Sequence, residues 1–112
     1  MNAQFVDKWK SQVKKGVLEF IILVLLNTKE LYGYELLDKL KLTMGYEVAE
    51  GTIYPLLNRL KDENLITSYW LEMESGVPRK YYKMTPEGKE ILKQMQGYWQ
   101  ELNNNILKLT QP

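Results

Sequence analysis

The sequence predicts a mainly α-helical fold with one small β-hairpin (an α+β fold) and a long helix at the C-terminal end. Three observations predict it. Four segments repeat apolar residues at helical spacing. Residues 66–73 and 79–84 are rich in aromatic and β-branched residues and are bounded by turn-forming residues. From Gly88 to Leu109 apolar residues recur at alternating intervals of four and three. A length of 112 residues fits a single domain.

The first helix is expected from about Gln4 to Asn27. Its early part places Phe5, Trp9 and Val13 on one face, and an apolar segment, Val17–Leu26, follows. That segment is far shorter than the ~20 residues of a membrane span. No small-residue cleavage site follows it, as a signal peptide would require. We therefore expect a buried helix in a soluble, cytoplasmic protein with no membrane partner.

The second and fourth helices have clear end signals. Tyr32–Met44 has helical periodicity, and Gly45 suits a helix C-terminus. The last helix is expected to begin with Thr85 as N-cap and Pro86 at the first helical position. Glu87 then lies in the first turn, where the helix dipole favours an acid.

The third helix is expected to start between Glu50 and Thr52 and to end near Glu63. Pro55 would break a helix interior, but it is tolerated if Thr52 is the N-cap, because first-turn amides lack intrahelical partners. One face is apolar and predicts core: Ile53, Leu56, Leu57 and Leu60. The opposite face is polar.

Charge is concentrated in two places, although the net charge is only +1. Residues 1–15 carry four lysines against one aspartate, a net charge of +3. Residues 75–83, in the hairpin, carry Arg79, Lys80 and Lys83 with no acid, again +3. Such patches fit a protein that contacts phosphates at chosen points. For the first patch, ordinary solvated lysine is an equally good interpretation.

Composition argues against an enzyme. The chain has no cysteine and no histidine, which removes thiolate chemistry, the commonest general base and the usual transition-metal ligands. It also has no GxxxxGK[ST] phosphate loop. We expect no catalytic residues, no metal site and no cofactor.

The regular apolar spacing of the last helix predicts a homodimer. A helix so long and apolar cannot bury its face within so small a domain, so a second copy is the expected partner. The expected interface comprises Leu92, Met95, Trp99, Leu102, Ile106 and Leu109, with Phe5 and Trp9 of the first helix. Packing only on the first helix of the same chain is the alternative.

A helix with one buried and one polar face, followed by a basic hairpin, is typical of a winged helix-turn-helix that reads duplex DNA. The candidate DNA-binding residues are Thr52, Tyr54, Pro55, Asn58 and Arg59 of the third helix, with Arg79 and Lys80 of the hairpin. Simple solvation is the alternative for each, and for Tyr54 packing on the preceding helix. Residues 1–84 would form the DNA-binding part and residues 85–112 the dimerisation helix, in one compact unit.

Four sequence segments resemble the hallmarks of PadR-type transcriptional regulators: YGYEL at 32–36, GTIYPLLNRL at 51–60, PRKYY at 78–82 and TPEG at 85–88. The chain is similar to the short members, which have a single C-terminal helix. The resemblance implies a bacterial repressor that binds a double-stranded operator as a homodimer. It departs from the family at the hairpin tip, where Gly76-Val77-Pro78 replaces a glycine-rich turn.

The same resemblance implies a site for a small planar aromatic effector between subunits, where a tryptophan of the last helix stacks on the ligand. Trp99 matches that tryptophan, and Met95 is its flexible neighbour. Plain dimer packing of Trp99 remains the alternative. The alternative function is a winged-helix protein-interaction module without specific DNA binding. The near-neutral charge favours that module, and the basic hairpin argues against it.

Overall fold

The computed structural model describes residues 3–45 and 47–111. Within them, helices and strands follow the predicted order, with one additional short strand before the second helix. The elements are α1 (Ala3–Thr28), β1 (Leu31–Tyr32), α2 (Gly33–Met44), α3 (Glu50–Asp62), β2 (Ile66–Leu71), β3 (Arg79–Met84) and α4 (Pro86–Thr110). None of the helices described is long and apolar enough to cross a membrane.

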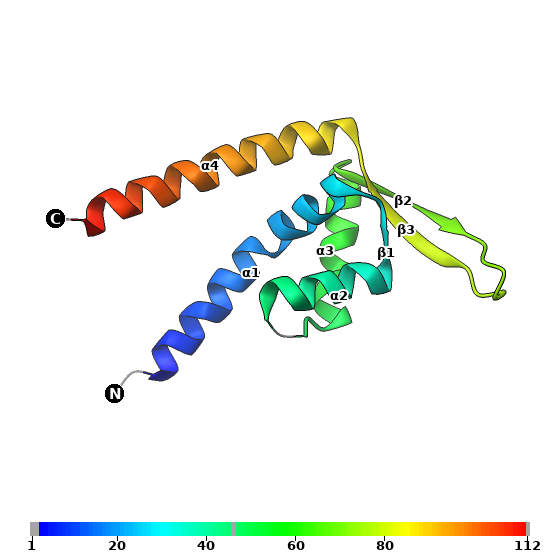
Figure 1. Cartoon of the computed structure of the whole chain (residues 1–112), viewed down its shortest axis with the longest axis horizontal. Coiled ribbons are helices and arrows are strands. Elements are labelled where there is room, and N and C mark those ends of the chain that lie inside the picture. The colour runs from blue at the N-terminus through cyan, green and yellow to red at the C-terminus, as the bar shows by residue number, and fades with distance from the viewer. Residues whose placement is uncertain (1–2, 46, 112) are drawn as a thin grey trace.

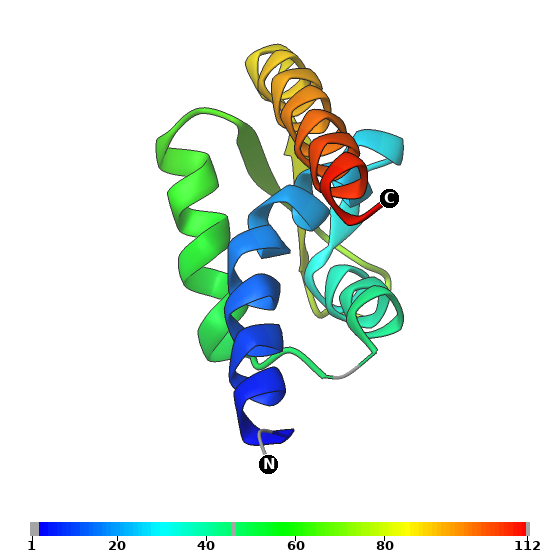
Figure 2. The same ribbon diagram turned by 90° about the vertical axis from the view of Figure 1, so that its left-hand side faces the viewer.

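The two longest helices project from a shared body. The second half of α1, together with α2, α3 and the sheet, forms that body, while the first half of α1 and most of α4 extend away from it and diverge (Figure 1). Turned by 90°, the molecule shows α2 and α3 on opposite sides of α1 (Figure 2). The longest dimension is 59 Å, against 34 and 21 Å for the other two.

One apolar core joins these elements. The helices supply Leu18, Ile22, Leu23, Leu26, Leu36, Leu40, Ile53, Leu57, Leu60 and Leu92, and the sheet supplies Leu31, Ile66, Tyr82 and Met84. Burying one such leucine or isoleucine contributes about 1.5–3 kcal/mol. The predicted core face of the third helix is confirmed, since Ile53, Leu57 and Leu60 are buried and Leu56 packs against them.

The sheet has three strands in the order β1-β3-β2, all antiparallel. Leu31 and Tyr32 pair with Tyr82 and Tyr81 of β3, so the predicted hairpin gains a third strand. The sequence prediction missed β1, because two residues are too few to show strand alternation. Consequently α2 begins at Gly33, with Tyr32 as its N-cap.

The predicted N-cap of α3 is wrong. The N-cap is Ala49, whose carbonyl accepts hydrogen bonds from the Thr52 and Ile53 amides at 2.9 and 3.2 Å. Pro55 therefore lies inside the helix, beyond the four amides that lack partners. The proline removes the bond to the carbonyl of Gly51, and Gly51 is exposed, so water can satisfy that carbonyl.

The start of α4 is as predicted. Thr85 is the N-cap, and its Oγ1 accepts a hydrogen bond from the Gly88 amide at 2.8 Å. The Thr85 hydroxyl donates to the Asn64 carbonyl at 2.7 Å, which ties α4 to the segment after α3. Gly88 is needed for close approach, because a Cβ there would lie 2.9 Å from the Leu65 carbonyl carbon and closer still to its oxygen.

Candidate nucleic-acid interface

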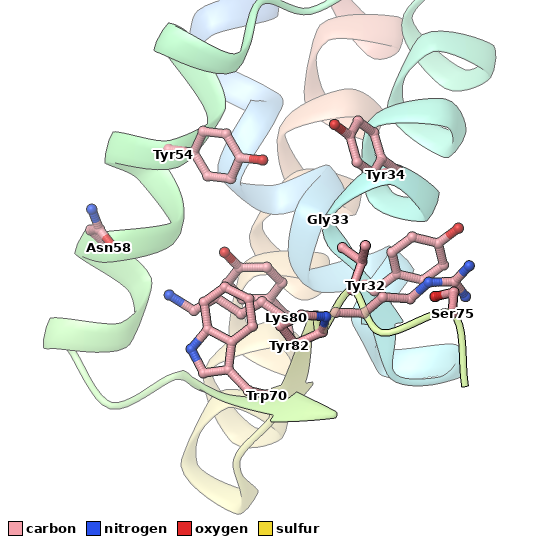
Figure 3. Close-up of a pocket in the computed structure, with 12 residues that line it drawn as sticks. Tyr32, Gly33, Tyr34, Tyr54, Asn58, Trp70, Ser75, Lys80 and Tyr82 are labelled. Atoms are coloured by element: carbon pink, nitrogen blue, oxygen red, sulfur yellow. The ribbon is translucent and has the colours of Figure 1, made fainter. Parts of the chain in front are cut away.

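A groove lies between the helix pair α2–α3 and the hairpin of β2, β3 and residues 72–78, which we call the wing. This wing groove has a volume of about 620 Å³ and is shown in Figure 3. Its walls carry five aromatic side chains together with two cations: Tyr32, Tyr34, Tyr54, Trp70, Tyr82, Arg79 and Lys80. Aromatic faces and cations are a common lining for a surface that holds nucleic acid.

Four of the predicted DNA-binding residues meet in the wing groove. Tyr54 and Asn58 enter it from α3, one helical turn apart, and Arg79 and Lys80 enter it from β3. In Figure 3, Tyr54 and Asn58 lie on α3 across from Trp70, Lys80 and Tyr82. The fold thus brings together residues from two segments about 20 positions apart in the sequence.

The other three candidates lie outside the groove. Thr52, Pro55 and Arg59 are exposed and follow one another at helical spacing, on the flank of α3 away from the wing. Arg59 forms an ion pair with Glu19 of α1, with Nη1 and Oε1 3.4 Å apart. The Glu19 side chain is only 23% exposed, so Arg59 is held toward α1.

The wing cations rest on aromatic rings. The Arg79 guanidinium carbon lies 4.4 Å from the centroid of the Tyr32 ring. The Lys80 ammonium lies 5.7 Å from the Trp70 ring centroid and 5.8 Å from that of Tyr82. Such cation–π contacts hold the cationic groups in place without neutralising them. Both cations therefore keep their charge available for an anionic ligand.

Two tyrosines of the groove, Tyr54 and Tyr82, have phenol groups with a raised pKa and so stay hydrogen-bond donors. Burial raises the pKa of the Tyr54 phenol above its ordinary value, and Glu50 and the neighbouring Tyr34 add to the rise. Burial also raises the pKa of Tyr82, with a smaller effect of Tyr54. A protonated phenol donates one O–H, which suits a phosphate oxygen.

Tyr32 and Tyr34 line the wing groove, and Lys61 lies on the same face of α3 as Asn58 and Tyr54, but none of the three was among the predicted binding residues. Tyr32 and Tyr34 were assigned only to a helix start, because β1 and the bend after it were not foreseen. Lys61, in the last turn of α3, was also missed, although its distance of three residues from Asn58 and seven from Tyr54 puts all three on one helix face. That spacing could have identified Lys61.

A second cavity lies between the two projecting helices. This α1–α4 cleft, with a volume of about 430 Å³, is lined mainly by apolar side chains, including both predicted ligand-binding residues, Met95 and Trp99. Trp99 contacts Phe20 of α1 with ring centroids 5.9 Å apart. The structure thus places both residues in one apolar cleft.

The expected interface residues fall into two groups. Leu92 is buried in this chain's own core, and Met95 packs against that core. The others are exposed: Phe5, Trp9, Trp99, Leu102, Ile106 and Leu109. Every residue of α4 from 96 to 110 is exposed, as is every residue of α1 from 3 to 13. Both helices therefore present unburied apolar faces.

The order of α2, α3 and a basic wing, with α3 exposing its polar face beside a cationic groove, defines a winged helix-turn-helix protein. Comparison with known proteins identifies its family. Residues 22–94 match the model of the transcriptional regulator PadR-like family. The chain therefore belongs to the PadR-like family of transcriptional regulators.

Individual relatives agree with this assignment. A PadR-like transcriptional regulator structure from Bacillus cereus is 40% identical, with a TM-score of 0.81 over 90% of this chain and 98% of that one. An uncharacterised protein of Lysinibacillus sphaericus is 31% identical over 87% of this chain and 91% of its own length. The negative transcriptional regulator PadR of Bacillus subtilis is 35% identical over 68% of this chain but only 43% of its own.

The family confirms the predicted fold class and the expectation that this chain is not an enzyme, since its members are transcriptional regulators.

Proposed function

We propose that this chain is a cytoplasmic, homodimeric repressor that binds a double-stranded DNA operator through α3 and the wing. The observation that carries the proposal is the wing groove, where Tyr54 and Asn58 of α3 face Arg79 and Lys80 of β3. Residues 1–84 would supply this surface, and residues 85–112 the dimerisation helix. Repression agrees with the name of the Bacillus subtilis relative, a negative transcriptional regulator.

The two walls of the wing groove would contact different parts of the duplex. The exposed face of α3 would enter the major groove, where Asn58 can bind adenine through N6 and N7. The DNA backbone would then cross the wing groove, where tyrosine hydroxyls and the cations Arg79 and Lys80 meet phosphate oxygens. Thr52 and Pro55 would lie beside the backbone on the far flank of α3.

A second copy of the chain would cover the exposed apolar faces of α1 and α4. Phe5 is 66% exposed and Ile106 is 48% exposed, on the projecting ends of helices where every residue from 3 to 13 and from 96 to 110 is exposed. A twofold dimer would place two α3 helices in successive major grooves about 34 Å apart. Operator half-sites would then be related by the same twofold axis.

The α1–α4 cleft would accept a small planar aromatic effector. Trp99 and Phe20 offer ring faces, and Met95 offers an adaptable thioether side chain. Plain packing of Trp99 in the dimer is the other outcome. Titration of the tryptophan fluorescence with planar aromatic compounds separates the two, because only a ligand site gives saturable quenching that Trp99→Leu abolishes.

The test of DNA binding is fluorescence anisotropy with a labelled duplex from upstream of the protein's own gene, at several salt concentrations. The native duplex should bind more tightly than a scrambled one. The double variant Arg79→Gln/Lys80→Gln should bind both duplexes more weakly, and the salt slope should fall by up to about 2, because each lost phosphate contact removes about 0.9.

The matched control is Lys89→Gln/Lys93→Gln, which removes two charges from exposed positions of α4. It should leave the salt slope nearly unchanged. Equal, weak binding of the wild-type protein to native and scrambled duplexes and to genomic fragments would instead favour a winged-helix module that binds protein.

Arg59 would reach DNA only by exchanging Glu19 for a phosphate or a guanine edge. Glu19→Gln should therefore raise DNA affinity about two- to fivefold, since exposed ion pairs contribute up to about 1 kcal/mol. The gain should vanish in the Arg59→Gln background, where no guanidinium is released. A gain that persists there, or an Arg59→Gln protein that binds like wild type, would remove Arg59 from the interface.

A further inference from the structure

We infer that Lys61 and Lys80 together hold one phosphate of the DNA backbone, as a clamp between the end of α3 and the wing. The inference rests on the proposed DNA-binding function and adds Lys61, the residue that sequence analysis missed. It concerns the last turn of α3, which holds Lys61, and the part of the wing groove that is lined by Lys80.

The two lysines approach from different elements. Lys61 lies in the last turn of α3, on the face shared with Asn58 and Tyr54, which line the groove. Lys80 lies on β3 and reaches between the rings of Trp70 and Tyr82 (Figure 3). Both lysines are half-buried rather than fully solvated. The two side chains come close enough for their charges to interact, so helix and strand direct two cationic groups to neighbouring positions.

Neither ammonium is neutralised by the protein. Among residues 3–45 and 47–111, neither Lys61 nor Lys80 forms an ion pair with an acidic side chain. Burial lowers the pKa of Lys80, and the nearby charge of Lys61 lowers it further. Two like charges in a partly desolvated place disfavour each other. An anion between them would relieve that repulsion.

The chemistry of the place suits a phosphate. Lysine is a compact charge with three donors, so two lysines can share the oxygens of one phosphate. The rings of Trp70 and Tyr82 restrict Lys80 before the anion arrives. The DNA backbone that borders the major groove occupied by α3 would pass this point on its way to the wing. The clamp would therefore fix the position of α3 on the duplex without reading the base sequence.

A shared phosphate makes a quantitative prediction. Lys61→Gln and Lys80→Gln should each weaken binding to native and scrambled duplexes alike, by about tenfold, the effect of a lost charged hydrogen bond. Because both lysines serve one phosphate, the double variant should lose little more than either single one. Independent contacts would instead give about a hundredfold loss, the product of the two.

Dissociation constants across salt concentrations provide the second readout. The salt slope should fall by at most about 0.9, in the single variants and in the double variant alike, since only one phosphate is involved. Lys93→Gln, an exposed lysine of α4, is the control and should change the dissociation constant less than twofold. Additive losses, or a Lys61→Gln protein that binds like wild type, would overturn the clamp.

A measurement without DNA separates failure of the clamp from failure of the proposed function. In a Trp9→Phe/Trp99→Phe background, Trp70 is the only tryptophan and lies beside Lys80. Titration with pyrophosphate should change its fluorescence saturably, and Lys61→Gln should abolish the change. No response would overturn the clamp even if DNA binds. A response in a protein that binds no duplex would overturn its assignment to DNA.

Discussion

Gly88→Ala is expected to lower the free energy of unfolding by about 3 kcal/mol, at the upper end of the usual cost of overpacking. The added methyl group would lie 2.9 Å from the Leu65 carbonyl carbon and overlap its oxygen. Gly88 is buried near the start of α4, so the methyl group has no open space to enter.

The obstacle at Gly88 is backbone that is fixed on both sides. The Leu65 amide donates to the Leu60 carbonyl at 2.9 Å, and the Leu65 carbonyl accepts from the Thr85 amide at 3.1 Å. Moving Leu65 would break these bonds, and moving α4 with its N-cap Thr85 would break the hydrogen bond from the Thr85 hydroxyl to the Asn64 carbonyl. Relief by a small side-chain shift is therefore not available, and the substitution should loosen α4 from the DNA-binding part.

Gly97→Ala is the matched control in the same helix. A Cβ at Gly97 meets nothing within 4 Å. Alanine there should raise the free energy of unfolding by about 0.5–1 kcal/mol, because glycine is a poor helix former. Urea denaturation of both variants provides the comparison. Equal stability of Gly88→Ala and wild type would mean that α4 does not approach Leu65 this closely.

Much of this fold could be predicted because its helices are long and strongly periodic. The core face of α3 and the cap of α4 were correct, since each depends on residues close together in the sequence. Thr52 as N-cap of α3 was wrong. Pro55 need not lie in the first turn, because the carbonyl that loses its partner belongs to the exposed Gly51.

What the sequence could not provide was contact between distant segments. Gly88 was assigned to the apolar repeat of α4, but its role is the approach to Leu65. Arg59 was predicted to bind DNA together with Asn58. It is the next residue around α3, however, and its side chain points toward Glu19. Lys61 could be placed beside Lys80 only when the path of the wing was known.

Ile106→Glu is expected to convert the proposed dimer into a monomer. Ile106 is 48% exposed in the single chain, in a part of α4 where every residue is exposed. In a dimer the same position would be desolvated, and a carboxylate there would lack a partner, at a cost of several kcal/mol. Analytical ultracentrifugation should show the change in mass directly.

Asn104→Glu is the control, with the same added charge on the same helix. Asn104 is exposed and lies about 200° around α4 from Ile106, away from the proposed interface. It should leave the dimer intact. The unfolding midpoint should also rise with protein concentration for wild type and Asn104→Glu but not for Ile106→Glu, because only a dimer gains stability by mass action.

Loss of the dimer should reduce operator affinity far more than half-site affinity. Two linked α3 helices bind a two-fold operator with a high effective concentration for the second contact, which strengthens binding by about 10²–10⁴-fold. Ile106→Glu should therefore bind the full operator at least about a hundredfold more weakly, yet bind a single half-site as tightly as wild type. The half-site comparison isolates the cause. Ile106 lies near the C-terminal end of α4, and no residue of α4 lines the wing groove, so a folded monomer keeps that surface. Figure 1 shows this end of α4 extending away from the wing. Equal losses on both duplexes would mean that the substitution damages the DNA-binding part itself. If a proven monomer bound the full operator with wild-type affinity, dimerisation would not contribute to operator binding.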